Sequence, residues 1–307
     1  MSVQVKSVNL FFNKMLDVYK KNGLPIDESL LAFSSDAMHK AATGDWSVCV
    51  VELRDKLATS LSQSLSNAHL FDPKPYVRNI SLPDGKSINI AIINQQSAEW
   101  YGTEGTIGSL DFLLEAQRGV FKNCFSFLDL GGHQLVWATY YAMTSKHAVV
   151  KSFEPSILNA VIGLFNCLIN DVIDRVDVIP FAVSASSSTI EQNDSDKMLV
   201  DFMTIPLKTC HLDDAVSGSF DFVKTDIEGY EYELLSDTKF IQFIKNSKSS
   251  HFELHLGHLV KRGITLEDCV NALKSAKLSG VELYSQKEMY DFLSNCDRNG
   301  FYSFLIS

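Results

Sequence analysis

From residue 125 onward the chain alternates short apolar runs with stretches of helical periodicity, and this alternation limits the folds open to it. The apolar runs are Phe125–Leu130, Ala148–Phe153, Val176–Val183, Phe220–Thr225, His251–Leu256, Val281–Tyr284 and Phe301–Ile306. Helical patterns separate several of them, notably Ser156–Ile169 and Thr265–Ala276, where Thr265 and Asp268 resemble a capping box. The alternation predicts an α/β fold with a doubly wound, mostly parallel sheet of seven strands.

Ligands of such a sheet bind beyond the carboxyl ends of the strands, near the point where the strand order reverses. Polar residues that end the apolar runs should therefore share one rim of the sheet. These residues are Asp129, Glu154, Ser184, Asp226 and His255.

The first run ends in Asp129-Leu130-Gly131-Gly132 and leads into a helical stretch, which is the order of a nucleotide site. A strand that merely ends in two glycines is an equally good reading of this segment taken alone. Glu154 ends the second run, 23 residues after Gly131, where an acid can accept hydrogen bonds from a ribose diol. The turn lacks the third glycine of a dinucleotide site, which disfavours a nicotinamide-dependent oxidoreductase.

A second informative stretch is Phe220–Glu231, in which a buried strand is followed by three carboxylates, Asp226, Glu228 and Glu231. Carboxylates this close repel one another unless a cation, a proton or hydrogen-bond donors offset them. A solvated turn is the alternative, but Lys224 and Asp226 at the same strand end favour a site.

These stretches together resemble the FkbM-type S-adenosylmethionine-dependent methyltransferases over about residues 120–307. The matching segments are Phe127–Gly131, Phe153-Glu154-Pro155 with Asn159, Leu164, Asn166 and Asn170, Pro180–Ser184, Leu212-Asp213, Val223–Glu231 and Glu253–His255. The Lys-x-Asp-x-Glu-Gly-x-Glu run from Lys224 to Glu231 is the most specific part. The family's first loop usually reads D-x-G-A-N-x-G, whereas this chain has His133 for the Asn and Leu135 for the last Gly.

The resemblance implies a Rossmann-like methyltransferase sheet and S-adenosylmethionine as the cofactor. Asp129, Gly131 and Gly132 would hold its amino-acid part and Ser184 would lie near the adenine. Glu154, followed by Pro155, would hold the ribose. The expected reaction is O-methylation of a small molecule, sugar or glycan.

An alcohol needs a base, and the catalytic candidates are Asp226, Glu228 and His255. Asp226 would also face the sulfonium. If His255 is the base, activity should rise with pH near the ordinary histidine value of about 6.5. A divalent cation held by some of Asp226, Glu228, Glu253 and His255 is an alternative. We expect a metal-free site, because the sulfonium charge also accounts for the acidic rim.

Residues 1–72 are predicted to form a helical extension, and residues 73–307 the methyltransferase domain, with a hairpin at 76–93 and a core at 120–307. Asp72–Pro75 is the best linker, since two prolines break both periodicities. The apolar stripe of the first helix includes Val8, Phe11 and Tyr19. It should face the catalytic domain or a second subunit, so a homo-oligomer through these helices is an open alternative.

The formal charge of −10 disfavours nucleic acid and anionic lipid as partners, and no apolar run approaches a membrane span. Six scattered cysteines without a Cys-x-x-Cys pair suggest packing residues in a reducing, cytoplasmic protein. A further reading is a binding or assembly module that keeps the fold without turnover. Binding of S-adenosylhomocysteine, of NAD or of neither would separate the three functions.

Overall fold

The computed structural model describes residues 3–26, 28–61, 71–82, 85–102, 118–185, 189–190 and 207–306. The sequence also predicts a helix from Leu110 to Gln117, but these residues lie outside the described ranges, as do Pro83 and Asp84 of the predicted hairpin at 76–93. In the described part of the chain, none of the helices combines the length and the apolar character that crossing a bilayer demands.

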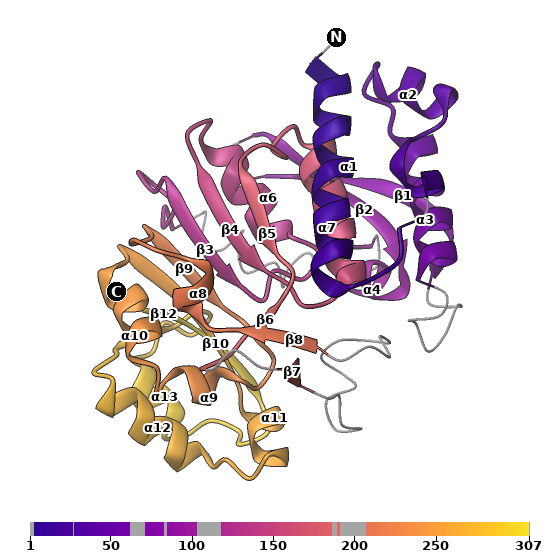
Figure 1. Ribbon diagram of the computed structural model, residues 1–307. Coiled ribbons are helices and arrows are strands. Elements are labelled where there is room, and N and C mark those ends of the chain that lie inside the picture. Colours follow the sequence, from indigo (N-terminus) through magenta and orange to yellow (C-terminus); the bar gives the residue numbers. More distant parts are fainter. Residues whose placement is uncertain are drawn as a thin grey trace.

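A seven-stranded sheet forms the centre of the molecule, as the alternation predicts (Figure 1). Its strands, in spatial order, are β11 (Gly280–Glu282), β12 (Phe301–Ile306), β10 (Ser249–His255), β9 (Phe222–Thr225), β3 (Ser126–Leu130), β4 (Val149–Phe153) and β5 (Val176–Ile179). The five strands from β10 to β5 are parallel, and β12 runs antiparallel to both of its neighbours. The prediction of a mostly parallel seven-stranded sheet is confirmed.

The strand order reverses between β3 and β9. From β3 the chain proceeds to β4 and β5 on one side, and later to β9 and β10 on the other. The carboxyl ends of β3 and β9 therefore meet at the crevice where doubly wound sheets bind their ligands.

Alternate residues of each strand face opposite sides of the sheet and divide the core in two. Phe127 and Phe222 pack with α6 (Val136–Thr144) and α7 (Ile157–Ile169). Leu128 and Val223 pack on the other face, where the helices are α10 (Thr238–Asn246), α12 (Leu266–Ser275) and α13 (Met289–Leu293). Thr265 caps α12 through the predicted capping box with Asp268.

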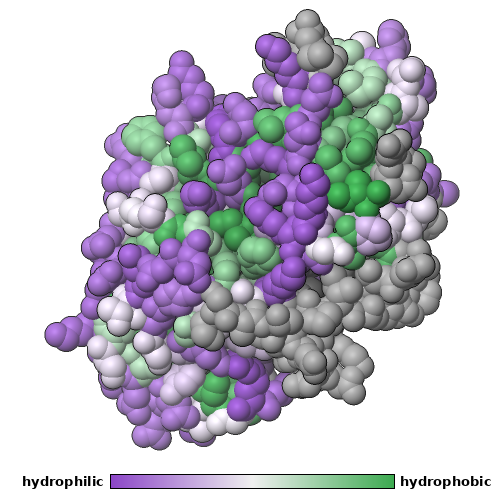
Figure 2. All heavy atoms as spheres, in the orientation of Figure 1, coloured by the Kyte–Doolittle hydropathy of each residue, from purple (hydrophilic) through white to green (hydrophobic). Residues whose placement is uncertain are grey.

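The N-terminal helices α1 (Val3–Asn22), α2 (Ser35–Ala41) and α3 (Ser47–Ser60), with the short 3-10 helix Glu28–Leu31, belong to the same core as α6 and α7. Helix α1 packs along α7, and the rings of Phe11, Phe33 and Trp46 surround that of Phe165 at 5.9 to 6.1 Å. The outer face of α1 is largely hydrophilic (Figure 2). The apolar stripe is thus buried within one chain and does not by itself require a second subunit.

Strands β1 (Phe71–Ser81) and β2 (Ser87–Asn94) pair antiparallel as a hairpin beside α7. Asn166 of α7 and Asn170, which caps this helix, accept hydrogen bonds from the backbone N–H groups of Ala91 and Asn89, both at 2.8 Å, and so cover the free edge of β2. Interpreting Asp72–Pro75 as a linker is wrong. The segment lies within β1, where the register shifts between Phe71 and Tyr76, and such an irregularity tolerates prolines without a ladder N–H.

The predicted strand Val176–Val183 divides at Pro180. Its second part, β6 (Ala182–Val183), leaves the central sheet and pairs with β8 (Leu207–Cys210), which also pairs with β7 (Thr189–Ile190). Short helices complete the described fold: α4 (Gln95–Tyr101), α8 (Leu212–Ala215), α9 (Glu231–Leu234) and α11 (Leu256–Lys261). All six cysteines are free thiols.

Candidate active site

The glycine turn after β3 is shaped by the close approach of neighbouring strand ends. A Cβ on Gly131, whose φ is 85°, would lie 1.7 Å from the carbonyl oxygen of Asp226. A Cβ on Gly132 would lie 2.1 Å from Oγ of Ser152. The N–H groups of both glycines donate to the carbonyl oxygen of Phe153, at 3.1 and 2.8 Å. These glycines are therefore required by the chain's own packing, and their N–H groups are engaged inside the protein.

The two departures from the family's loop pattern both adopt left-handed backbone conformations. His133 has φ 48° and Leu135 has φ 54°, a region that costs a non-glycine residue about 1–2 kcal/mol. The Leu135 side chain is fully buried against Gly163 of α7, whose missing side chain makes room for it. Leu135 thus keeps a glycine-like backbone at that position while its side chain fills space beside α7.

Glu154 follows β4 and supports the loop directly. Its Oε2 accepts a hydrogen bond from the His133 N–H at 2.6 Å, and its Oε1 accepts one from the Ser156 N–H at 2.8 Å. Burial raises the pKa of Glu154 to about 8, although both backbone hydrogen bonds lower it. Ser156 caps α7, so Pro155 lies just outside this helix.

Asp129 lies below the rim in a buried polar cluster. Its Oδ2 accepts a hydrogen bond from Ser152 Oγ at 2.7 Å, and its Oδ1 lies 3.6 Å from Lys224 Nζ. Lys224 also contacts Asp226 Oδ2 at 3.0 Å and donates to the Gly131 carbonyl at 2.7 Å. Burial lowers the pKa of Lys224, but Asp226 and Asp129 outweigh this and hold that pKa above its ordinary value. The lysine therefore stays charged and ties β3, the glycine turn and β9 together.

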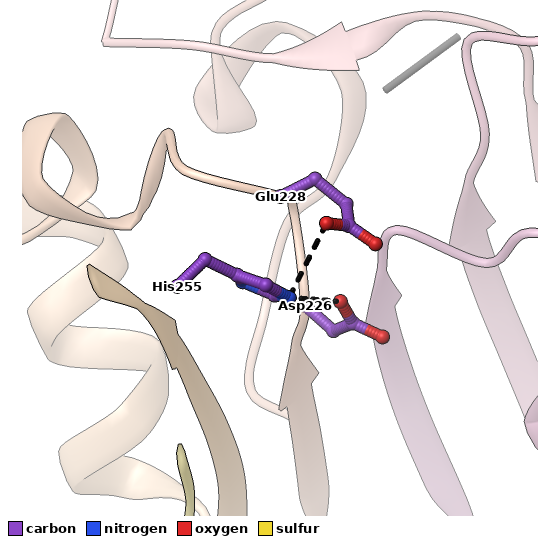
Figure 3. Close-up of side chains that lie close together, drawn as sticks. All are labelled: Asp226, Glu228 and His255. Carbon is purple, nitrogen blue, oxygen red and sulfur yellow. Dashed lines mark ion pairs between the residues drawn. The ribbon is translucent and has the colours of Figure 1, made fainter. Parts of the chain in front are cut away.

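The predicted catalytic residues converge where β9 and β10 end (Figure 3). Nε2 of His255 lies 3.6 Å from Asp226 Oδ1, 3.4 Å from Glu228 Oε2 and 3.5 Å from Glu253 Oε1. Its Nδ1 lies 2.9 Å from Oε1 of Glu231, a fully buried carboxylate at the start of α9. The sequence placed Glu231 in the motif without a role, and the structure makes it the partner that orients His255.

Protonation in this cluster differs from the sequence-based expectation. Burial lowers the pKa of His255, but Glu231, Glu228 and Asp226 outweigh it and raise that pKa to about 10. Burial raises the pKa of Glu228 to about 7, against the opposing effect of His255. Burial also raises the pKa of Asp226, but Lys224 and His255 outweigh it and hold that pKa below its ordinary value. The expected histidine titration near 6.5 is therefore wrong for this protein, whose His255 is cationic at neutral pH.

An aromatic group beside the glycine turn was missed as a site feature. Trp100 stacks on the His133 ring at 4.7 Å, and Tyr101 Oη lies 2.9 Å from His133 Nδ1. Burial raises the pKa of Tyr101, and the carboxylates of Asp226, Asp129 and Glu154 raise it further. Burial lowers the pKa of His133 to about 3, so this imidazole is neutral. In the sequence, the aromatic and glycine-rich segment at Trp100-Tyr101-Gly102 favours an ordinary loop over one that covers a ligand, whereas the structure places Trp100 and Tyr101 in α4.

Ser184 does not end a strand of the central sheet, contrary to the predicted rim. It follows β6 in the small sheet, and its N–H donates to the Cys210 carbonyl at 3.2 Å. The other predicted rim residues, Asp129, Glu154, Asp226 and His255, do lie at or next to the carboxyl ends of β3, β4, β9 and β10.

The site suits a cofactor that has polar groups and a positive charge. Among the described residues, two of the buried polar atoms without a hydrogen-bond partner, His133 Nε2 and Asp129 Oδ1, belong to residues at this site. Carboxylates of Asp226 and Glu228 remain partly exposed at the rim, where they would favour a cation.

A family model described as "Methyltransferase FkbM domain" matches residues 116–299, which is more than half of the chain. No curated protein matches the sequence.

Several solved structures resemble the fold at low identity. An O-methyltransferase from Bacillus cereus in complex with SAH is 12% identical, with 69% of this chain and 84% of that chain covered and a TM-score of 0.39. A fibrillarin pre-rRNA processing protein from Methanococcus jannaschii is 11% identical. The match covers 75% of this chain and 81% of that chain, with a TM-score of 0.40. The O-methyltransferase TomG from Streptomyces achromogenes is 12% identical. The match covers 69% of this chain and 85% of that chain, with a TM-score of 0.39. Similarities of this size say nothing about the reaction or substrate of this chain.

Proposed function

Because the chain belongs to the FkbM methyltransferase family, we propose that it transfers a methyl group to a hydroxyl of a small molecule, sugar or glycan. The methyl donor of the family is S-adenosylmethionine. The observation that carries the proposal is the convergence of Asp226, Glu228 and His255 at the strand ends beside the glycine turn. Methylation of a hydroxyl needs both a place for the sulfonium and a group that takes a proton, and this cluster offers both.

Different residues around the glycine turn would bind different parts of the cofactor. Glu154 would form hydrogen bonds with the ribose, and the N–H groups of His133 and Ser156 hold its side chain in position. The amino-acid part would lie along Gly131 and Gly132, above the buried pair of Asp129 and Lys224. His133 Nε2, buried and neutral, offers a further polar atom beside this part of the site. We assign the adenine to the side of Ser184 and Pro155.

When bound, S-adenosylmethionine supplies a methyl group on a positive sulfur, so that the new C–O bond forms as the C–S bond breaks and sulfur keeps the electron pair. Asp226 stabilises positive charge at this point and helps to hold the reacting atoms in line. The hydroxyl proton goes to a carboxylate of the cluster. Glu228, with a pKa of about 7, suits this role, whereas the cationic His255 does not.

The acceptor is expected to be neither nucleic acid nor a lipid surface. A formal charge of −10 and an acidic rim would repel the phosphates of both. A neutral or cationic hydroxylated molecule meets no such barrier.

Two measurements on the full chain test the function. Calorimetry should show saturable binding of S-adenosylhomocysteine, and label from methyl-labelled S-adenosylmethionine should appear on oxygen in a panel of hydroxylated acceptors. Asp226→Asn and Glu228→Gln should lower turnover. Glu233→Gln, a carboxylate of the same region that pairs with Arg262, is the matched control and should not. Absence of S-adenosylhomocysteine binding, or transfer only to nitrogen or carbon, would contradict the proposal.

A further inference from the structure

The side chains of Asp226, Glu228 and His255 point toward a common centre (Figure 3). One ligand atom from each lies within 4.8 Å of the others. Oxygen and nitrogen atoms that bind one divalent cation at about 2.1–2.3 Å are themselves separated by about 3–4.5 Å. The three side chains therefore lie close to the mutual spacing of ligands around a single ion.

The orientation of His255 points independently to a ligand at Nε2. The imidazole is only 4% exposed, and its Nδ1 is held by the buried Glu231 at 2.9 Å. The carboxylate oxygens of Asp226, Glu228 and Glu253 lie 3.4 to 3.6 Å from Nε2, beyond the range of a good N–H···O hydrogen bond. A histidine fixed through one nitrogen by a carboxylate, with the other nitrogen presented to further acids, is the arrangement that orients metal-binding histidines.

The backbone at Glu228 directs its carboxylate into the same centre. Glu228 has φ 57°, a left-handed conformation that is costly for glutamate. Glu231, which orients His255, also accepts hydrogen bonds from the Gly229 N–H with both oxygens, at 2.9 and 3.1 Å. One buried carboxylate thus fixes both the histidine and the turn that presents Glu228.

We propose that Asp226, Glu228 and His255 bind one divalent cation of the Mg²⁺ and Mn²⁺ class, an inference that rests on the proposed function for its role in catalysis. Two carboxylates and one imidazole suit Mn²⁺ well, and the site keeps further positions for water or an acceptor oxygen. The cation would displace the proton from Nε2 of His255 to solvent and take over its role of offsetting the carboxylates. The cation would bind the acceptor hydroxyl and favour its loss of a proton, which would pass to solvent while Glu228 serves as a ligand. This differs from the metal-free site expected from the sequence, which gave no sign that Glu231 lies behind His255.

Calorimetric titration of the full chain with MnCl₂ tests the site without any need for turnover. The wild-type protein should bind one Mn²⁺ per chain, and Asp226→Asn, Glu228→Gln and His255→Asn should each weaken binding about ten-fold or more. Glu233→Gln is the matched control and should bind as the wild type does. If His255→Asn does not fold, the part-exposed Glu228 still decides the question through Glu228→Gln.

Lack of saturable Mn²⁺ binding, or equal weakening by Glu228→Gln and Glu233→Gln, would overturn the inference. A protein that binds S-adenosylhomocysteine but not Mn²⁺ would leave the proposed function standing with Glu228 as the base. A protein that binds Mn²⁺ at these residues but no S-adenosylhomocysteine would support the metal site and refute the function.

Discussion

Leu135 and Gly163 are expected to interact so strongly that Gly163→Ala lowers the stability of the wild-type protein but raises it when the Leu135 side chain is removed. A Cβ added at Gly163 would lie 2.3 Å from Cγ and 2.8 Å from Cβ of Leu135, which is fully buried and cannot move aside cheaply. Overpacking of this kind costs about 1–3 kcal/mol. Replacing a glycine inside a helix with alanine otherwise gains about 1 kcal/mol. We therefore expect Gly163→Ala to destabilise the wild-type protein by up to about 2 kcal/mol.

Leu135→Gly is the required background, because Leu135→Ala would retain the Cβ that lies 2.8 Å from the new atom. Removal of a buried leucine side chain costs about 3–5 kcal/mol, and release of the left-handed strain returns about 1 kcal/mol. The single variant should thus be less stable by about 2–4 kcal/mol. With the clash gone, Gly163→Ala should then stabilise it by about 0.5–1 kcal/mol.

Urea unfolding followed by far-UV circular dichroism measures all four proteins of this cycle. Opposite signs for Gly163→Ala in the two backgrounds are the expected result. The same sign in both, or a neutral Leu135→Gly, would refute the argument that Leu135 occupies the space left by Gly163.

Four other outcomes follow from the contacts of the site and of the N-terminal helices. Glu154→Ala should weaken S-adenosylhomocysteine binding by about 0.5–1.5 kcal/mol through the loss of a neutral hydrogen-bonding group, and an unchanged dissociation constant in calorimetry would remove the ribose assignment. Because burial raises the pKa of Glu154 from 4.5 to about 8, the folded state holds a proton that the unfolded chain has lost, so stability should fall as pH rises across that interval. Glu154→Gln should reduce this slope in urea unfolding between pH 5 and 8, and an identical slope would contradict the assignment. Lys224→Met should destabilise the protein by about 3–5 kcal/mol, because Asp129 loses its cation. The double variant Lys224→Met with Asp129→Asn should recover part of the lost stability, and no recovery would argue against the buried pair. Deletion of residues 1–61 should cause aggregation by exposing α7 around Phe165, whereas a monodisperse truncated protein in light scattering would contradict that packing.

The sequence by itself determined the sheet and most of its rim. Apolar runs and helical stripes are local patterns, so they located the strands of the central sheet and the capping box at Thr265. Because the parallel strands of a doubly wound sheet end on one side, the positions of Asp129, Glu154, Asp226 and His255 followed from chain order alone. The break at Pro180, which takes Ser184 out of the central sheet, was not anticipated.

Only the tertiary structure decided the chemistry of those residues. Glu231 and His255 are 24 positions apart, and Tyr101 and His133 are 32 apart, so no local pattern could reveal that they meet. The charge on His255 depends on the carboxylates that folding gathers around it, and the balance between burial and these charges carries its pKa to about 10. Leu135 is likewise acceptable in a glycine position only because α7 places Gly163 opposite it. Packing partners and electrostatic fields arise from contacts between distant segments, whereas periodicity and strand order can be read along the chain.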